Sequence, residues 1–142
     1  MRHPGAFTLV AEGALETSED PNGDRVLNED SILGFLVAES GRGGIGHGGI
    51  GHGKTGHIIT IDVRSGARRH RVGSALLEAA EVRLLSAQCQ MVRLETAVDN
   101  AAAISFYKRR GYNVIQTIPH YYSSGVDALM LEKDLLLPVA SS

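Results

Sequence analysis

The sequence predicts an α/β domain in which one mixed sheet carries two helices. Apolar runs rich in Val, Ile and Leu alternate, in the middle of the chain, with two stretches of helical periodicity. The composition is that of a globular chain, with 43% hydrophobic and 21% charged residues. A length of 142 residues fits one domain and leaves no room for two. Residues 1–142 are therefore expected to form a single domain.

Six strands are expected, each an apolar run bounded by turn residues. The first two runs are joined by an acidic segment rich in turn formers at 16–31, and the last two by a loop with Pro119 and Gly125. Short connections of this kind favour hairpins. The expected strands are 6–11, 32–38, 57–63, 91–98, 112–118 and 126–132.

Two helices complete the pattern. The first, residues 73–87, repeats leucine and alanine at helical spacing. The second, residues 100–110, begins with Asn100 as its N-cap and is followed by Gly111, a residue type that commonly follows helix ends. The order is then β-β-β-α-β-α-β-β, and the strand–helix–strand alternation implies a partly parallel sheet.

Charge and cysteine content exclude several classes of protein. Fourteen basic and sixteen acidic side chains give a net charge of −2, so the chain lacks the overall positive electrostatic field that would attract nucleic acid. The single cysteine, Cys89, forms no internal disulfide. No apolar run is long enough to span a bilayer, and the first residues do not resemble a signal peptide. We expect a cytoplasmic protein with no membrane or nucleic-acid partner.

Residues 41–56 are expected to form a flexible loop rich in glycine and histidine. Nine of the 17 glycines fall here, and ordering so many of them is costly. The segment from Gly48 to Thr55 satisfies the phosphate-loop pattern, but a strand follows it instead of the helix that such a site requires. Histidines recur every five residues at His47, His52 and His57, yet a flexible loop would not orient their rings for a metal. We expect no metal site.

The junction between strand 57–63 and the first helix carries four arginines within eight residues, Arg64, Arg68, Arg69 and Arg71. A helix N-terminus offers free backbone N–H groups that suit phosphate oxygens, and arginines add charge-assisted hydrogen bonds. The alternative is a solvated basic loop with no ligand. Spacing alone does not decide between the two.

Three segments together resemble the GNAT family of N-acetyltransferases. The run Arg68-Arg69-His70-Arg71-Val72-Gly73-Ser74 is similar to the family's coenzyme A loop, and residues 100–112 resemble the next helix and strand. Residues 121–130 are similar to the protein N-terminal acetyltransferase branch, which includes the ribosomal-protein alanine acetyltransferases. The resemblance covers residues 32–135 in the right order.

The chain departs from the family pattern at two points. Arg71 stands where the coenzyme A loop has its middle glycine, so the backbone there must tolerate a side chain. The resemblance also leads us to expect that the chain begins at the family's second strand, without the first strand and two helices that shape the acceptor site in the family. The resemblance therefore leaves the acceptor undefined.

The resemblance implies acetyl-CoA as co-substrate and a set of contacts for it. Asn100 would contact coenzyme A, and Tyr107 would act as the acid that protonates the leaving sulfur. A buried aromatic beside Phe106 is the alternative for Tyr107. The implied cofactor-binding residues are Ile61, Val63, Arg68, Arg69, His70, Arg71, Val72, Gly73, Ser74, Asn100 and Tyr107.

The resemblance also implies a base and an acceptor-binding pair. Glu95 lies where the ribosomal-protein acetyltransferases place a catalytic glutamate, and His57, on the adjacent strand, is the alternative base. His57 also shares strand parity with Ile59, Ile61 and Val63, so the alternative is that it simply lies at the end of a buried face. Tyr121 and Tyr122 would bind the acceptor backbone, or else pack on the sheet.

Three functions stay open at this point. The chain would transfer acetyl to a protein or peptide N-terminal amine, to a small-molecule amine, or bind acyl-CoA without catalysis. A sheet that begins at the family's second strand and a tail with Leu135, Leu136 and Leu137 leave apolar surface uncovered, so a homodimer is also expected.

Overall fold

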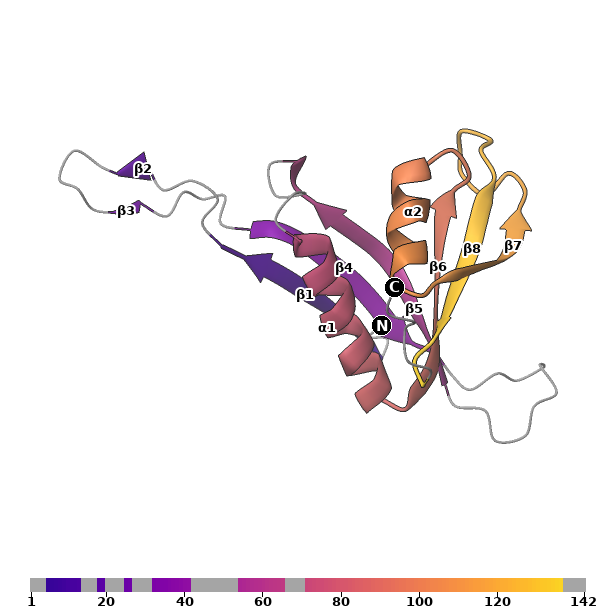
Figure 1. Cartoon of the computed structure of the whole chain (residues 1–142), viewed down its shortest axis with the longest axis horizontal. Coiled ribbons are helices and arrows are strands. Elements are labelled where there is room, and N and C mark those ends of the chain that lie inside the picture. Colours follow the sequence, from indigo (N-terminus) through magenta and orange to yellow (C-terminus); the bar gives the residue numbers. More distant parts are fainter. Residues whose placement is uncertain are drawn as a thin grey trace.

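A computed structural model describes residues 5–13, 18–19, 25–26, 32–41, 54–65 and 71–136. A six-stranded mixed sheet in the order β1-β4-β5-β6-β8-β7 carries both helices on one face (Figure 1). The strands of this sheet are β1 (Ala6–Glu12), β4 (Ile32–Ser40), β5 (Lys54–Val63), β6 (Cys89–Ala97), β7 (Asn113–Ile118) and β8 (Ala128–Asp134). The helices are α1 (Val72–Ser86) and α2 (Ala101–Arg109). This architecture confirms the predicted fold class.

The sheet is antiparallel except between its two middle strands. β5 and β6 pair in parallel from Lys54 with Cys89 to His57 with Arg93, where the pairing ends. β5 nevertheless runs on to Val63 and β6 to Ala97, so the two strands part beyond this point. On its other edge, β6 pairs with β8 in an antiparallel arrangement from Met91 to Ala97. The parting of two middle strands leaves a gap in hydrogen bonding at the centre of the sheet.

The core lies between α1 and the sheet. α1 contacts β1, β4, β5 and β6, and the helix buries one side. Its buried residues are Val72, Leu76, Leu77, Ala80 and Leu84. The leucine and alanine spacing read from the sequence therefore identifies the buried side of this helix.

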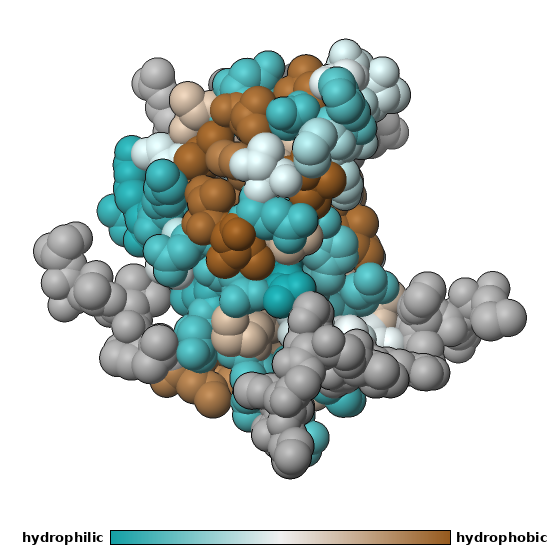
Figure 2. All heavy atoms as spheres, turned by 90° about the vertical axis from the view of Figure 1, so that its right-hand side faces the viewer, coloured by the Kyte–Doolittle hydropathy of each residue, from teal (hydrophilic) through white to brown (hydrophobic). Residues whose placement is uncertain are grey.

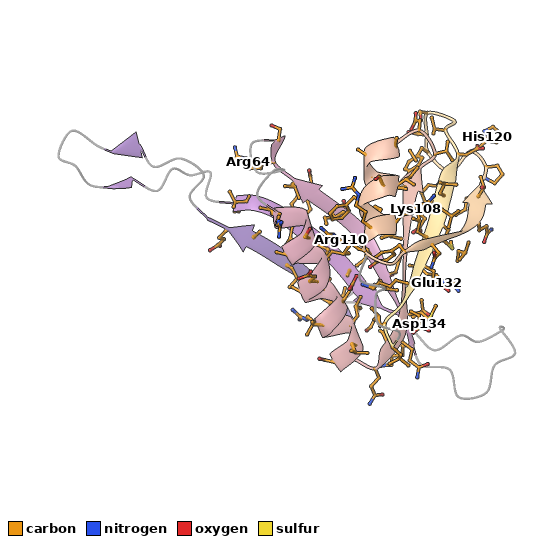
Figure 3. All side chains as sticks on the ribbon, viewed as in Figure 1. Arg64, Lys108, Arg110, His120, Glu132 and Asp134 are labelled. Atoms are coloured by element: carbon orange, nitrogen blue, oxygen red, sulfur yellow. The ribbon has the colours of Figure 1, made fainter. Side chains whose placement is uncertain are left out.

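α2 is anchored at both ends. The Asn100 side chain accepts a hydrogen bond from the Ala103 backbone N–H at 3.2 Å, which confirms the predicted N-cap. At the other end, Arg110 lies between the two helices (Figure 3), donates to the Ser74 hydroxyl and stacks over the Phe106 ring at 4.7 Å. The start of α1 and the end of α2 are thus tied together.

The expected loop at 41–56 is wrong at its end. Residues Lys54–Gly56 belong to β5, and Gly56 is buried. Glycine at position 56 allows close packing, because a Cβ there would lie 2.8 Å from the Leu84 methyl groups. Residues 42–53, with His47, His52 and most of the phosphate-loop pattern, lie outside the described residues.

The acidic segment at 16–31 also differs from the expected plain loop. Two short strands within it, β2 (Ser18–Glu19) and β3 (Arg25–Val26), pair in an antiparallel arrangement. They form a sheet of their own, separate from the six-stranded one. The described residues therefore hold eight strands, against the six expected.

The surface at the β7–β8 end of the sheet mixes apolar and polar side chains (Figure 2). β7 contributes Val114 and Ile115, which are both exposed. Within the described part of the chain, no helix has the length and apolar character needed to cross a membrane.

Candidate active site

An exposed residue, Arg71, lies at the junction between β5 and α1, directly before the helix. Its backbone has φ 58°, in the left-handed region that favours glycine, and it caps α1 without a side-chain hydrogen bond. This is the position at which the resemblance expects a glycine. No acidic residue lies in the first turn of α1, so the positive end of the helix dipole is not neutralised there. Arg68, Arg69 and His70 lie outside the described residues.

Gly73 joins three elements at the start of α1. A Cβ at this position would lie 3.4 Å from the Phe106 ring of α2 and 3.7 Å from Val63 at the end of β5. Ser74, the next residue, accepts the hydrogen bond from Arg110. The structure thus brings three predicted coenzyme A residues, Val63, Gly73 and Ser74, close to the end of α2, whereas Val72 is buried in the core.

Glu95 and His57 lie side by side where β5 and β6 part. The His57 Nε2 atom is 2.7 Å and 2.9 Å from the two carboxylate oxygens of Glu95. On β6, Val92 and Leu94 are buried in the core beneath the helices, so alternation places Glu95 on the opposite face. The two residues predicted as alternative bases are therefore one hydrogen-bonded pair.

A β-bulge decides the face on which His57 lies. Ala38 of β4 pairs with Ile58 and Val37 pairs with Thr60, so Ile59 is an extra residue in β5. Ile61 and Val63, beyond the bulge, pack against the core, whereas His57 pairs with Glu39 on the other face. The parity that placed His57 on one face with Ile61 and Val63 is wrong for this reason.

Two further groups complete the surroundings of Glu95 and His57. The Glu39 carboxylate lies 3.8 Å from His57 Nδ1. The Tyr121 hydroxyl donates to Glu95 Oε1 at a long 3.4 Å. Tyr121 comes from the β7–β8 loop, which is held by hydrogen bonds between Tyr122 and residues Gly125 and Val126. Tyr121 and Tyr122 stack edge to face, with ring centroids 4.9 Å apart.

Tyr107 is a buried side chain of α2. Its ring packs edge to face on Phe106 and Tyr112, so it is part of the aromatic core. Burial, and in second place the nearby Tyr122, raise the pKa of Tyr107 to about 12. The pKa of Tyr122 is raised by burial and by Tyr121 and Glu95. Tyr122 therefore stands within electrostatic reach of both Tyr107 and Glu95.

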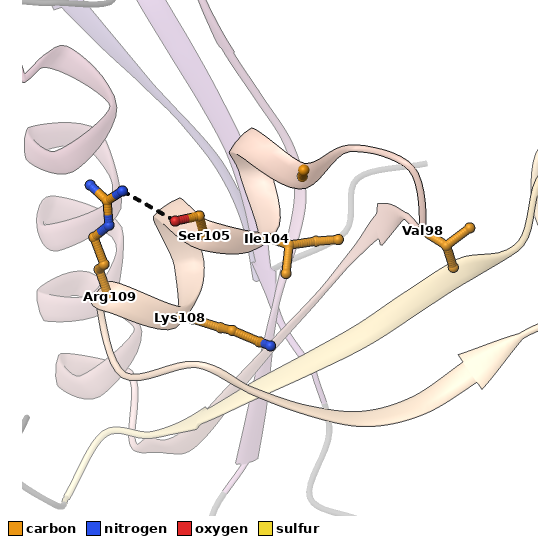
Figure 4. Close-up of a pocket in the computed structure, with 6 residues that line it drawn as sticks. Val98, Ile104, Ser105, Lys108 and Arg109 are labelled. Atoms are coloured by element: carbon orange, nitrogen blue, oxygen red, sulfur yellow. Dashed lines mark hydrogen bonds between the residues drawn. The ribbon is translucent and has the colours of Figure 1, made fainter.

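A groove of about 500 Å³ lies on α2 (Figure 4). It is lined by Val98, Ala101, Ile104, Ser105, Lys108 and Arg109. Arg109 donates to the Ser105 hydroxyl across it at 3.2 Å. None of these residues belongs to the predicted site.

The family model described as acetyltransferase (GNAT) family matches residues 7–112 of this chain. The chain belongs to the GNAT family. One relative, the N-alpha-acetyltransferase of Sulfurisphaera tokodaii, is 35% identical over 79 residues, which are 55% of this chain and 47% of the relative. N-alpha-acetyltransferase 30 of Dictyostelium discoideum is 36% identical over 72 residues, which are 51% of this chain and 37% of that protein.

Solved structures show the same fold. Ard1 of Thermoplasma volcanium has a TM-score of 0.65 and 30% identity, over 77% of this chain and 67% of that one. A structure of the NatC complex bound to Gag peptide and CoA has a TM-score of 0.64 and 25% identity, over 78% and 68% of the two chains. The GNAT chain spans about half the length of the curated relatives that it matches most strongly.

Glu39 is the site residue that sequence reasoning missed in this GNAT chain. The expected strand ended at Ala38, whereas β4 runs on to Ser40. A carboxylate beside a predicted strand end is an ordinary surface feature, and only its pairing with His57 distinguishes it. Within the described ranges, no group of three or more His, Cys, Asp or Glu is arranged to hold a metal ion.

Proposed function

We propose that this GNAT chain is the catalytic domain of an acetyl-CoA-dependent N-acetyltransferase that acts on protein or peptide N-termini. One observation carries the proposal. The imidazole of His57 is hydrogen-bonded to the Glu95 carboxylate at the point where β5 and β6 part. Tyr122, in the loop between β7 and β8, interacts electrostatically with both Glu95 and Tyr107. The relatives named N-alpha-acetyltransferases support an N-terminal amine as the acceptor.

The residues at the α1 N-terminus fit coenzyme A. The helix start has no side-chain cap, its first turn has no acidic side chain, and Gly73 keeps the surface between β5 and α2 free of a side chain. Arg68, Arg69, His70, Arg71 and Ser74 would hold the pyrophosphate, and Ile61, Val63 and Asn100 the pantetheine arm. When bound, acetyl-CoA supplies the acetyl thioester.

Glu95 is the proposed base and Tyr107 the proposed acid. Glu95 takes a proton from the acceptor amine, while His57 and Tyr121 hold its carboxylate by hydrogen bonds. Tyr107 is protonated at neutral pH, as an ordinary tyrosine is, and its pKa of about 12 means that it holds the proton more firmly. Its hydroxyl is therefore available as a hydrogen-bond donor to the leaving sulfur. Tyr121 and Tyr122 line the acceptor side of the site.

The test is acetyl transfer from acetyl-CoA to a panel of N-terminal peptides and small amines. Glu95→Gln keeps the shape of the side chain, and we expect kcat to fall by roughly 10²–10⁴-fold. The loss should shrink at higher pH, since more of the acceptor amine is then free. Tyr107→Phe should lower kcat with no recovery at high pH. Glu12→Gln, an exposed carboxylate at the end of β1, is the control.

Three results would contradict the proposal in whole or in part. Transfer to small amines with none to peptides would assign the chain to small-molecule acetylation. Acetyl-CoA binding without transfer to any acceptor would make it a non-catalytic acyl-CoA module. Wild-type turnover by Glu95→Gln would remove Glu95 as the base.

The coenzyme A assignment has a separate test by isothermal titration calorimetry. The double variant Arg68→Ala with Gly73→Asp should bind acetyl-CoA more weakly by at least about 1.5–3 kcal/mol, the value of one charge-assisted hydrogen bond. The new carboxylate would also repel phosphate from the helix start. Arg109→Ala, on the other side of α2, is a matched loss of one arginine and should leave affinity unchanged. Equal affinity in the folded double variant would overturn the loop assignment.

A further inference from the structure

The His57 ring lies between two carboxylates that come from the strands on either side of it. Glu39 of β4 pairs with His57 of β5 in the antiparallel register, and its Oε1 atom faces Nδ1 at 3.8 Å. Glu95 of β6 faces the other ring nitrogen, Nε2, at 2.7 Å. Three neighbouring strands thus place a carboxylate, an imidazole and a carboxylate in a row on the face opposite the helices.

The other polar groups near the row are already engaged. Arg93, the parallel partner of His57 on β6, directs its Nε atom to Glu132 of β8 at 2.5 Å. Tyr121, from the β7–β8 loop, points its hydroxyl at Glu95. The groups that face His57 from its two neighbouring strands are therefore Glu39, Arg93 and Glu95, and two of these are carboxylates.

The outer carboxylate determines what the ring can do. Which nitrogen of an imidazole carries a proton depends on the group that the other nitrogen meets. Nε2 must carry a proton to donate to the Glu95 carboxylate, and Nδ1 must carry one as well if it is to donate to Glu39. A ring with both protons has no lone pair left to accept a proton from an amine. Glu95 is then left as the acceptor.

Exposure separates Glu95 from the other two members of the row. The Glu95 side chain is 12% exposed, whereas those of His57 and Glu39 are 36% and 31% exposed. The sheltered member of the row is the one suited to meet the reacting amine, and the outer two support it from the solvent side.

We propose that Glu39 is a positioning residue, which holds the His57 ring as a hydrogen-bond donor to Glu95 and so leaves Glu95 as the base. The assignment of Glu95 as the base rests on the function proposed above. The arrangement of Glu39 and His57 does not, and it has a readout of its own.

The first experiment is NMR of the imidazole nitrogens of His57 in the full chain, compared between the wild type and Glu39→Gln. We expect both nitrogens protonated in the wild type, and loss of the Nδ1 proton in Glu39→Gln. His57→Gln assigns the signal, and Glu12→Gln is the matched loss of a carboxylate. An unchanged Nδ1 signal in Glu39→Gln would overturn the proposal, whether or not the chain transfers acetyl.

The second experiment is a double-mutant cycle on turnover. Glu39→Gln should lower kcat by about 10- to 100-fold, as expected for a misplaced catalytic group, and leave the KM for acetyl-CoA unchanged. In the His57→Gln background, the same change should have no further effect. Equal losses in both backgrounds would show that Glu39 does not act through His57. Full activity of Glu95→Gln would refute the base assignment alone, since the NMR result stands apart from it.

Discussion

Arg71 adopts a backbone conformation that is unfavourable in free energy for any residue other than glycine. A non-glycine residue in the left-handed region costs roughly 1–2 kcal/mol, and Arg71 adopts φ 58° at the start of α1. Arg71 also belongs to the loop proposed above to hold the pyrophosphate of coenzyme A, where its positive charge would favour phosphate.

Among substitutions of Arg71, the glycine variant should therefore be more stable than the valine variant. We expect Arg71→Gly to raise the free energy of unfolding by about 0.5 kcal/mol, because relief of strain exceeds the added freedom of the unfolded chain. Arg71→Val should lower it by about 1–2 kcal/mol, because a β-branched side chain fits this region poorly. Urea unfolding of the two variants measures both values. A valine variant as stable as the glycine variant would show that the residue is not strained.

Because Tyr107 is buried, the stability of the fold should fall at alkaline pH. Its pKa is about 12 in the folded chain and about 10 in the unfolded one, so the folded state keeps the proton longer. The stability is complete below pH 10 and is lost as pH rises toward 12, by about 2–3 kcal/mol in total. Burial and the Glu81 carboxylate raise the pKa of Tyr112 as well, which steepens the loss. Urea unfolding at several alkaline pH values should show it, and Tyr107→Phe should make the decline shallower.

At the scale of elements, close approach between β5 and α1 depends on a missing side chain. Gly56 faces Leu84, which is fully buried, and a Cβ at position 56 would contact its methyl groups at 2.8 Å. This contact lies directly before His57, so the packing of α1 helps to set the position of the candidate site.

Gly56→Ala should lower the free energy of unfolding by about 1–3 kcal/mol through overpacking. Leu84→Ala alone should lower it by about 2–5 kcal/mol, because it leaves a cavity. The double variant should be more stable than the sum of the two losses predicts, since the added methyl occupies part of that cavity. Strictly additive losses in thermal or urea unfolding would contradict a direct contact.

At the scale of the whole molecule, a buried polar group links the helix layer to the sheet. The Glu81 carboxylate of α1 accepts hydrogen bonds from the Lys133 ammonium of β8 and from the Tyr112 hydroxyl, each at 2.7 Å. Tyr112 is 1% exposed and packs on Tyr107. The group connects segments that are 31 and 52 residues apart in the sequence.

Removing one partner of this group should cost more than removing both. Glu81→Leu leaves the Lys133 ammonium uncompensated, and we expect a loss of about 3–5 kcal/mol. The double variant Glu81→Leu with Lys133→Met should recover part of that loss, because no charge is then left without its partner, whereas the buried Tyr112 hydroxyl still lacks its acceptor. Denaturant unfolding of the three proteins decides the matter. A double variant as unstable as Glu81→Leu would mean that packing rather than charge dominates here.

The homodimer expected from the sequence stays a prediction. The sheet face opposite the helices exposes Val10, Phe35 and Ile59, apolar side chains that a second copy would cover. Sedimentation at tens of micromolar should give a dimer, and Phe35→Lys should shift it toward monomer. A monomeric wild type would remove this expectation.

The sequence by itself determined the fold class, both helices and the kind of site. Periodicity identifies the buried side of α1, the Asn100 cap marks the start of α2, and linked motifs point to the GNAT family. These signals are local, since each arises from residues within one or two turns of helix or one strand. The resemblance to that family, rather than periodicity, named Glu95, His57 and Tyr107 as candidates.

Only the tertiary structure decided how those candidates meet. The bulge at Ile59 separates His57 from the buried Ile61, and the register of β4 brings Glu39 opposite His57. Neither feature leaves a local trace, because a one-residue shift in strand pairing changes the face of every side chain beyond it. Likewise, residue type alone does not tell whether Gly56 lies in a loop or in a closely packed strand. Its meaning depends on Leu84, which lies 28 residues away in the sequence and in contact in space.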